Sequence, residues 1–317
     1  MTNVIHLTFN DPREYERCIR LARVSDLVVS ESGSFEATLT ITNVGRVWLQ
    51  RGCEVLARTM RIAIENSQRS LAFLDDDNAA PIIQSGTELG AGDVVSFGQH
   101  TSHFQRTFGP IRWVAMSLLP ANLEAAMLAI SGKDLGDPSA TLRMKPSVAN
   151  LARLRRLSRE ANHLAISGEE VLGHPEVRRS LEQTLIAAAV ACLASDAEPA
   201  PGSGWHRHQQ IMLCFGEWLD TNKDRAVYLE EVCMALGVSA PTLRRCCEEH
   251  LGMSPMQYLG LRRMNLARQA LQRRDSQISV TAAAMNFGFW HLGRFADEYR
   301  SLFGESPSAT LARHSPR

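Results

Sequence analysis

Two neighbouring arginines near the C-terminus are the side chains best suited to recognise another molecule. Arg244 and Arg245 are adjacent, and a third arginine, Arg294, follows fifty residues later. A guanidinium can donate two hydrogen bonds to guanine O6 and N7 or neutralise a phosphate, and a good base contact contributes about 1–3 kcal/mol of discrimination. This arrangement favours binding to a nucleic acid.

The arginines stand inside a motif that occurs twice in residues 228–307. Leu236-Gly237-Val238-Ser239 and then Leu251-Gly252-Met253-Ser254-Pro255 are repeated as Phe287-Gly288-Phe289-Trp290 and then Phe303-Gly304-Glu305-Ser306-Pro307. Pro255 and Pro307 lie 52 residues apart but Gly237 and Gly288 only 51, so the second turn has gained one residue. Each copy predicts a short apolar helix, a turn with glycine and a second helix, which together make a helix-turn-helix.

The apolar spacing places the arginines on the outside of the second helix in the first copy. Ser239 can cap this helix by accepting a hydrogen bond from a free N–H in its first turn. Apolar residues recur every three to four positions after it, and this turns Arg244 and Arg245 outward. Residues 254–271 predict a longer helix, whose rigidity would set the distance between the two copies.

Other reactive side chains give weaker patterns. No GxSxG, Walker or strand-associated GxGxxG motif is present, so the sequence predicts neither a catalytic residue nor a cofactor. His100 and His103 have the spacing of two metal ligands but no third ligand nearby, so we interpret them as structural or surface histidines and predict no metal site. Residues 75–77, all Asp, lack the calcium-loop pattern and predict a solvated turn. Cys246 and Cys247 occupy apolar positions of the motif, which favours core packing over a redox switch.

Four aromatic residues of the N-terminal half are candidates for binding a small-molecule effector: Trp48, Phe73, Phe97 and Trp113. Ligand cavities combine mostly apolar walls with a few polar groups. Ordinary core packing is the more common role of any single aromatic residue. An effector site lined by these four aromatic residues is therefore a hypothesis, and core packing is its alternative.

Length and composition set the outer limits. The chain has 317 residues and is 44% hydrophobic, which exceeds the usual size of one domain and predicts two. The net charge is +0, with 14 Lys/Arg against 11 Asp/Glu from Trp205 onward, a weak basic bias. The seven cysteines form no CxxC pair and are expected to be reduced thiols. Without a signal-peptide pattern or an apolar stretch of about 18 residues, we expect a cytoplasmic protein with no membrane segment.

The first 120 residues predict strands. Residues 35–41 and 58–64 alternate apolar and polar side chains, and glycine and aspartate turns separate shorter runs up to about residue 118. Short strands separated in this way indicate an antiparallel β-barrel or sandwich. Residues 89–97 resemble a strand of cupin-like sensing domains, and the expected fold of this half is a cupin-like β-barrel.

Between residues 121 and 194 the period becomes helical. Apolar residues recur every three to four positions in residues 151–164 and 177–192, which predicts a pair of amphipathic helices. The pair could form a dimer seam or pack against the β-rich region of the same chain, and the sequence leaves both open. Residues 195–204 have the composition of a linker.

Residues 206–312 resemble the DNA-binding domain of the AraC/XylS family of transcriptional regulators. The likeness rests on several spaced motifs, among them the second Gly288-Phe289 turn and the closing Phe303-Gly304-x-Ser306-Pro307. The preceding part is similar to that family's sensing and dimerisation half in layout only. The resemblance implies DNA contacts at the start and first outward turns of each reading helix. By matching position these are Ser239, Ala240, Pro241, Arg244 and Arg245 in the first, and His291, Leu292, Gly293, Arg294 and Asp297 in the second.

The two sets of residues differ in chemistry. The first carries two arginines, whereas in the second Leu292 offers only an apolar contact, such as one to a thymine methyl, and Asp297 would repel phosphate. Trp290 replaces the small polar residue that usually leads into the second reading helix. His291 and Arg294 are its best polar candidates, so we expect the first helix to read DNA more strongly.

Together these observations predict a two-domain α+β protein with a β-barrel and helical pair followed by an all-α double helix-turn-helix. The expected division is a β-rich effector-sensing domain (1–120), a helical dimerisation or packing segment (121–194), a linker (195–204) and a DNA-binding domain (205–317). The expected function is that of a ligand-responsive transcriptional activator, not an enzyme. Its expected partners are a double-stranded DNA operator, a small-molecule effector, RNA polymerase and a second copy of the chain. The alternatives are a regulator whose N-terminal half only dimerises and a cupin-like enzyme fused to a DNA-binding tail.

Overall fold

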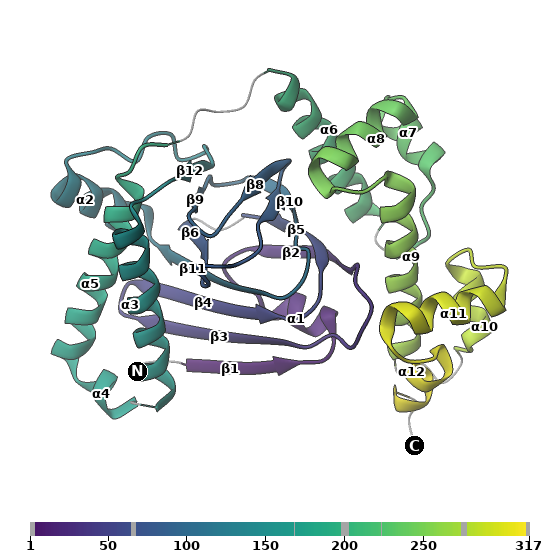
Figure 1. The fold of residues 1–317 in the computed structure, drawn as a ribbon, viewed down its shortest axis with the longest axis horizontal. Helices are drawn as coiled ribbons and strands as arrows, with labels where there is room; N and C mark the ends of the chain where they lie inside the picture. Colours follow the sequence, from purple (N-terminus) through teal and green to yellow (C-terminus); the bar gives the residue numbers. More distant parts are fainter. Residues whose placement is uncertain are drawn as a thin grey trace.

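The computed structural model describes residues 4–64, 68–167, 169–197, 203–222, 224–273 and 278–314. Within these residues the N-terminal half is built from strands with helices packed on them, and the C-terminal half is helical (Figure 1). The predicted division into a β-rich half and a helical half is confirmed. The strands, however, form two separate sheets and not a closed barrel.

The larger sheet has seven strands in the order β1-β3-β4-β11-β6-β9-β12, and the smaller has five in the order β2-β5-β10-β7-β8. Each sheet keeps two edge strands. Alternating sequence patterns do not distinguish this arrangement from a barrel, because they show which side chains share a face of a strand but not whether the sheet closes on itself. The bounds are β1 (Val4–Phe9), β2 (Arg23–Val29), β3 (Ala37–Val44), β4 (Val47–Glu54), β5 (Arg58–Ala63), β6 (Arg69–Leu74), β7 (Ile82–Gln84), β8 (Thr87–Leu89), β9 (Val94–Phe97), β10 (Ser102–Arg106), β11 (Ile111–Leu118) and β12 (Leu142–Met144).

Apolar cores lie on both sides of the larger sheet. On β6, Leu71 and Phe73 belong to the core shared with the helices of this half. Leu74, on the opposite face, belongs to the core shared with the smaller sheet, together with Ile62 of β5 and Ile82 of β7. This division follows from the two-residue period of a strand, which sends successive side chains to opposite faces.

Helices cover one face of the larger sheet (Figure 1). Leu151 and Leu154 of α3 and Leu185 of α5 are buried in the same core as Val114 of β11. The apolar stripes of the predicted helical pair therefore pack against their own sheet, which favours the intramolecular alternative, and dimerisation stays a prediction. The helices of this half are α1 (Pro12–Cys18), α2 (Pro120–Ser131), α3 (Val148–Ser167), α4 (Glu169–Gly173) and α5 (Pro175–Leu193).

Two helix-turn-helix units lie at opposite ends of a long helix, α9 (Pro255–Gln272) (Figure 1). The first unit consists of α7 (Leu229–Leu236) and α8 (Ala240–Leu251), and the second of α10 (Val280–Asn286) and α11 (Leu292–Phe303). Two further helices flank them, α6 (Ser203–Thr221) and α12 (Pro307–His314). Because α6 begins at Ser203, the predicted linker is already helical there, and its residues 198–202 lie outside the described residues.

The helix ends follow the signals in the sequence. Ser239, Ser254 and Ser279 each accept a hydrogen bond from a backbone N–H in the first turn of α8, α9 and α10. Gly237 and Gly252 end α7 and α8 with positive φ angles of 63° and 62°, a conformation that residues with a β-carbon rarely adopt. The caps thereby fix where each helix starts and stops, and the turns between them stay short.

Candidate nucleic-acid interface

The first turn of α8 is open to solvent and well anchored. The Ser239 hydroxyl accepts a hydrogen bond from the Thr242 N–H at 3.3 Å, while Ala240 and Pro241 lie exposed beside it. Leu243, the residue after Thr242, is fully buried in the core of the first unit. The start of α8 can therefore approach another molecule without disturbing the packing of the unit.

Arg244 and Arg245 extend from α8 into solvent, with 67% and 74% of their side chains exposed. Each donates from Nε to a glutamate one helical turn later, Arg244 to Glu248 at 2.8 Å and Arg245 to Glu249 at 3.1 Å. The hydrogen bond that Arg244 donates to Glu248 raises the pKa of Arg244, which is charged in any case. Exposed pairs of this kind contribute little to stability, so a phosphate or a guanine edge can displace the glutamates.

The start of α11 is built differently. His291 occupies the N-cap position but its side chain accepts no hydrogen bond from the helix, and its ring lies against the Trp290 ring at 3.9 Å between centroids. Leu292 and Gly293 are exposed at the first turn. The second unit therefore presents a mostly apolar surface where the first presents a serine cap.

The outward face of α11 carries charges of both signs. Arg294 is 79% exposed and donates to Glu298 at 2.7 Å, and Asp297 is exposed as well. The inner face is apolar, with Phe295 and Tyr299 buried in the core of the second unit. All ten residues that we expected at the interface lie at the solvent-facing start or outer face of α8 or α11, but whether they contact DNA stays a prediction.

An aromatic and arginine cluster joins the two units, and no pattern in the sequence indicates it. Arg263 of α9 lies over the rings of Tyr228 and Phe289, at 5.3 Å and 5.5 Å from their centroids. Tyr228 immediately precedes the first unit and Phe289 belongs to the turn of the second. Gly288 approaches this cluster so closely that a β-carbon there would meet the Tyr228 hydroxyl at 2.3 Å. The cluster therefore fixes the second turn against the start of the first unit.

The first unit also shares its core with the N-terminal half. Phe104 of β10 packs against Phe215 of α6 and Tyr258 of α9, with ring centroids 6.1 Å and 6.2 Å apart. Arg106 donates from an Nη to the carbonyl oxygen of Leu251 at 2.8 Å, which satisfies the last turn of α8. The N-terminal half is thus part of the support of α8.

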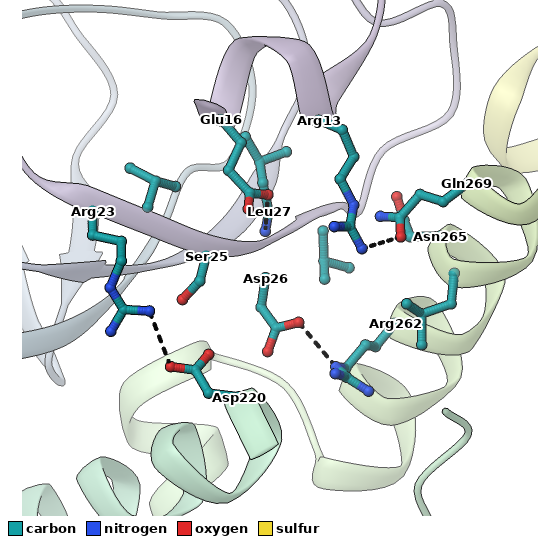
Figure 2. Close-up of a pocket in the computed structure, with 13 residues that line it drawn as sticks. Arg13, Glu16, Arg23, Ser25, Asp26, Leu27, Asp220, Arg262, Asn265 and Gln269 are labelled. Carbon is teal, nitrogen blue, oxygen red and sulfur yellow. Dashed lines mark hydrogen bonds and ion pairs between the residues drawn. The ribbon is translucent and has the colours of Figure 1, made fainter. Parts of the chain in front are cut away.

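A polar junction lies next to this shared core (Figure 2). Asp26, in an irregular part of β2, accepts a hydrogen bond from the Arg262 Nε at 3.0 Å, and Asp220 of α6 lies 3.5 Å from the Arg23 Nη1. The lining side chains enclose a cavity of about 220 Å³ between the two halves. Burial raises the pKa of the Glu16 carboxyl, at the edge of this cavity, to about 7. The junction connects the β-rich half directly to α9, which carries both units.

The four candidate effector residues do not share one cavity. Phe97 and Trp113 line a space of about 40 Å³ between the two sheets, with the Trp113 indole donating to Glu54 at 2.9 Å; Phe73 borders this space from β6, but its side chain belongs to the core on the helix-covered face. Trp48 is 41% exposed on β4, because its neighbours Val47 and Leu49 face the core and alternation turns it outward. The placement of Trp48 in a cavity was wrong. Effector binding by the other three stays a prediction.

The remaining candidates are mostly explained by packing. His103 is buried against Phe97, with ring centroids 5.1 Å apart, and burial lowers its pKa to about 3, while His100 is exposed. Cys246 and Cys247 are fully buried in the core of the first unit, and burial raises the pKa of Cys246 to about 11.

The predicted solvated turn at residues 75–77 was wrong in part. Asp75 is buried and forms ion pairs with Arg51 of β4 and Arg159 of α3. The paired arginines lie far away in the sequence, so no local pattern could have indicated them. Asp77, by contrast, is exposed.

The described residues contain neither a group of metal-ligating side chains nor a membrane-spanning helix. Among them no three His, Cys, Asp or Glu side chains are grouped as metal ligands. None of the helices in the part of the chain that the structure describes is long and apolar enough to cross a bilayer.

Known proteins resemble this chain most clearly at its C-terminal end. A family model described as a helix-turn-helix domain matches residues 232–313. The chain is 38% identical over 99 residues to XylDLEGF operon transcriptional activator 2 of Pseudomonas putida, covering 31% of this chain and 63% of that protein. It is 31% identical over 156 residues to the probable thc operon regulatory protein of Rhodococcus erythropolis, covering 47% and 46% of the two chains. A solved structure, that of the AraC-like transcriptional activator CuxR, matches 82% of this chain and 94% of its own at 16% identity, with a TM-score of 0.40.

The fold and the exposed helix starts define a double helix-turn-helix domain. The resemblance of this domain to the AraC/XylS family, predicted from the sequence, is confirmed by the helix-turn-helix match and by its similarity to these relatives. The match spans less than two thirds of the length of the curated relatives named above, 63% of the first and 46% of the second.

Proposed function

We propose that this protein is a sequence-specific DNA-binding transcriptional regulator that places α8 and α11 in successive major grooves. The observation that carries the proposal is the pair of helix-turn-helix units, each with the start of its second helix exposed, held at opposite ends of α9. In such units the second helix enters the major groove with its first residues at the base edges. A relative named as a transcriptional activator supports activation as the outcome.

We propose that the N-terminal half responds to a small-molecule effector. Its contacts with α6, α8 and α9 supply a physical route, because a shift of β2 or β10 would move side chains that support the first unit. The cavity between the sheets, at about 40 Å³, is far smaller than a typical ligand site of about 300–1,000 Å³, so an effector of ordinary size would have to open it. This coupling distinguishes the proposal from a regulator whose N-terminal half only dimerises.

The other expected partners follow from this function. An activator at an operator would meet RNA polymerase, and we propose that it acts in the cytoplasm as a homodimer, without catalytic activity. The dimer surface would lie outside the buried stripes of α3 and α5, since their own sheet covers those stripes.

Selection of binding sites from random duplex DNA by the full-length chain tests the proposal. We expect an asymmetric site with two recognised segments about 10 base pairs apart, the spacing of successive major grooves on one face of the duplex. The affinity for this site should fall steeply as salt rises, because binding releases counterions from phosphates. A folded chain that enriches no sequence and binds no duplex even at low salt would contradict the proposal.

Thermal denaturation of the full-length chain with a panel of metabolites tests the effector. A ligand present at 100 times its dissociation constant should stabilise the protein by about 2.7 kcal/mol. If no member of a broad panel shifts the transition while the chain binds DNA normally, the alternative in which the N-terminal half only dimerises is favoured.

A further inference from the structure

The turn of the second unit contains one residue that the turn of the first unit lacks. Gly237 and Gly288 occupy equivalent places, and the N-caps Ser239 and His291 occupy equivalent places too. Two residues separate Gly288 from His291, Phe289 and Trp290, where only Val238 separates Gly237 from Ser239. Phe289 matches Val238, so Trp290 has no counterpart.

Trp290 contributes little to the packing of its own unit. Its neighbour Phe289 anchors the turn, since it packs against Phe295 with centroids 4.9 Å apart and joins the core of the second unit. Trp290 is 79% exposed, and its indole N–H donates to no residue that the structure describes. A tryptophan can bury 150–250 Å² of surface, so leaving one in solvent forgoes a large apolar stabilisation. The inserted residue is therefore available to a partner.

The position of Trp290 at the start of α11 indicates the kind of partner that its side chain would contact. It lies one residue before the N-cap of α11, and its ring packs against the His291 ring at a tilt of 37°, beside the exposed Leu292. The side chains of Trp290 and Leu292, with the polar His291 between them in the sequence, form a largely apolar edge at the end of α11 that would enter a major groove. Thymine is the base that presents a methyl group in that groove, and apolar side chains are its usual contacts.

We propose that Trp290, held by His291, reads thymine methyl groups at the edge of the major groove, and that the second unit thereby recognises DNA by apolar contact. The proposal rests on the proposed function and deepens it. The second unit is then not a weakened copy of the first but a unit with a different chemistry. Loss of the tryptophan should remove sequence preference without removing charge.

The test replaces thymines of the selected operator one at a time by deoxyuridine, which deletes only the methyl group. With the full-length chain, at least one replacement in the segment bound by α11 should weaken binding about fourfold, the effect expected for one buried methyl. The same thymine replacement should not change the affinity of the Trp290→Ala variant for the operator. Trp290→Ala itself should bind the unmodified operator about tenfold more weakly, because it loses the methyl contact together with the other apolar area that the indole buries in the groove. Trp290→Phe should keep most of the affinity and of the methyl effect.

Trp48→Ala is the matched control, since it removes an exposed tryptophan from the other half of the chain. It should bind like the parent, and all variants should melt at the parent temperature. Trp290→Ala binding with parental affinity would overturn the proposal. So would an equal loss from the deoxyuridine replacements in the parent and in Trp290→Ala, because the methyl contact would then belong to another residue. Failure of the parent to bind any DNA would instead refute the proposed function.

Discussion

The two helix-turn-helix units share a fold but differ in how they are attached to the rest of the molecule. The core of the first unit includes Val28 and Phe104 from the N-terminal half, and Arg106 donates to the last turn of α8. The second unit packs around its own core, with a main-chain hydrogen bond of 3.1 Å from the Gly33 N–H to the Leu302 carbonyl oxygen as a contact with the loop between β2 and β3. An effector that moves the N-terminal half would therefore act first on α8.

The same comparison extends to recognition chemistry. The first unit, which shares its core with the N-terminal half, presents Arg244 and Arg245. The second unit, which has its own core, presents Trp290 and Leu292. Charged contacts supply most of the affinity for DNA and depend on salt, while apolar contacts depend on the sequence of bases. Regulation through the first unit would thus change affinity more than it changes the preferred sequence.

The largest effect is expected at the junction that attaches the first unit. Arg262 is buried, pairs with Asp26 and also donates to the carbonyl oxygens of Leu219 and Asn222. Arg262→Met leaves the largely buried Asp26 carboxylate and the carbonyl oxygens of Leu219, Asn222 and Arg225 without this donor, so it should lower the free energy of unfolding by about 3–5 kcal/mol. Chemical denaturation measures this. Arg300→Met, on the exposed face of α11, is the control, and a loss below about 1 kcal/mol at Arg262 would show that the junction does not hold the two halves together.

A smaller effect at the same junction should depend on pH. Burial raises the pKa of Glu16 from its usual 4.5 to about 7. Between pH 4.5 and pH 7 the Glu16 carboxyl is therefore protonated in the folded state and ionised in the unfolded state. The stability contributed by this proton is present below pH 4.5 and is lost as the pH rises through 7. Glu16→Gln should therefore stabilise the protein at pH 8, by up to about 3 kcal/mol, and leave it unchanged at pH 4. Denaturation at both pH values, with the exposed Glu14→Gln as control, checks the prediction, which an equal gain at both pH values would refute.

The arginines of α8 should matter for binding and not for stability. Arg244→Ala or Arg245→Ala should weaken operator binding by about 1–3 kcal/mol if the side chain contacts a base, and should relax specificity in one segment of the site. Fluorescence anisotropy with the selected operator and with single-base variants measures both quantities. Glu248→Ala, which frees Arg244 from its partner in the helix, is a useful comparison, because it should bind at least as tightly as the parent.

The cluster of Arg263, Tyr228 and Phe289 should control the distance between the two helix-turn-helix units. Arg263→Ala removes two cation–π contacts, each worth about 0.5–1 kcal/mol at a half-exposed site, and frees the second turn from Tyr228. We expect a small loss of stability and a wider tolerance for the distance between the two operator segments. Binding to operators with one base pair inserted or deleted measures this tolerance. Arg263→Lys keeps the charge without the flat guanidinium and should give an intermediate result, whereas parental spacing preference in Arg263→Ala would mean that α9 alone sets the distance.

The smallest effect is expected at Asp297. Asp297→Ala removes an exposed negative charge that would face phosphates, so binding should stay the same or tighten slightly. If this change weakens binding more than either arginine change, the carboxylate has a positive role, such as accepting from a cytosine amino group, and the ranking of the two units is wrong.

Local patterns predicted the helix-turn-helix units well, because Ser239, Ser254 and Ser279 cap the helices and Gly237 and Gly252 end them through short-range backbone chemistry. The same reasoning placed Arg244 on the surface. It could not place Trp48, whose outward direction depends on which face of β4 is covered, nor choose between a barrel and two sheets.

The contacts that join distant segments left no trace in the sequence. Asp26 and Arg262 are 236 residues apart, and neither lies in a recognisable motif. Phe104 alternates like any strand residue, yet it faces the helical half and not the core between the sheets. Such pairs depend on how two finished units dock, which the periodicity of either unit alone does not encode.

Binding to three operators tests the central claim most directly. These are the selected site, the site with one segment scrambled and the site with the other segment scrambled. The segment bound by α8 is identified as the one in which Arg244→Ala no longer discriminates between bases. The account predicts two recognised segments, with the larger loss of affinity when the α8 segment is scrambled and a smaller but measurable loss for the α11 segment. Equal losses, a larger loss for the α11 segment, or no loss from one of the two segments would contradict it.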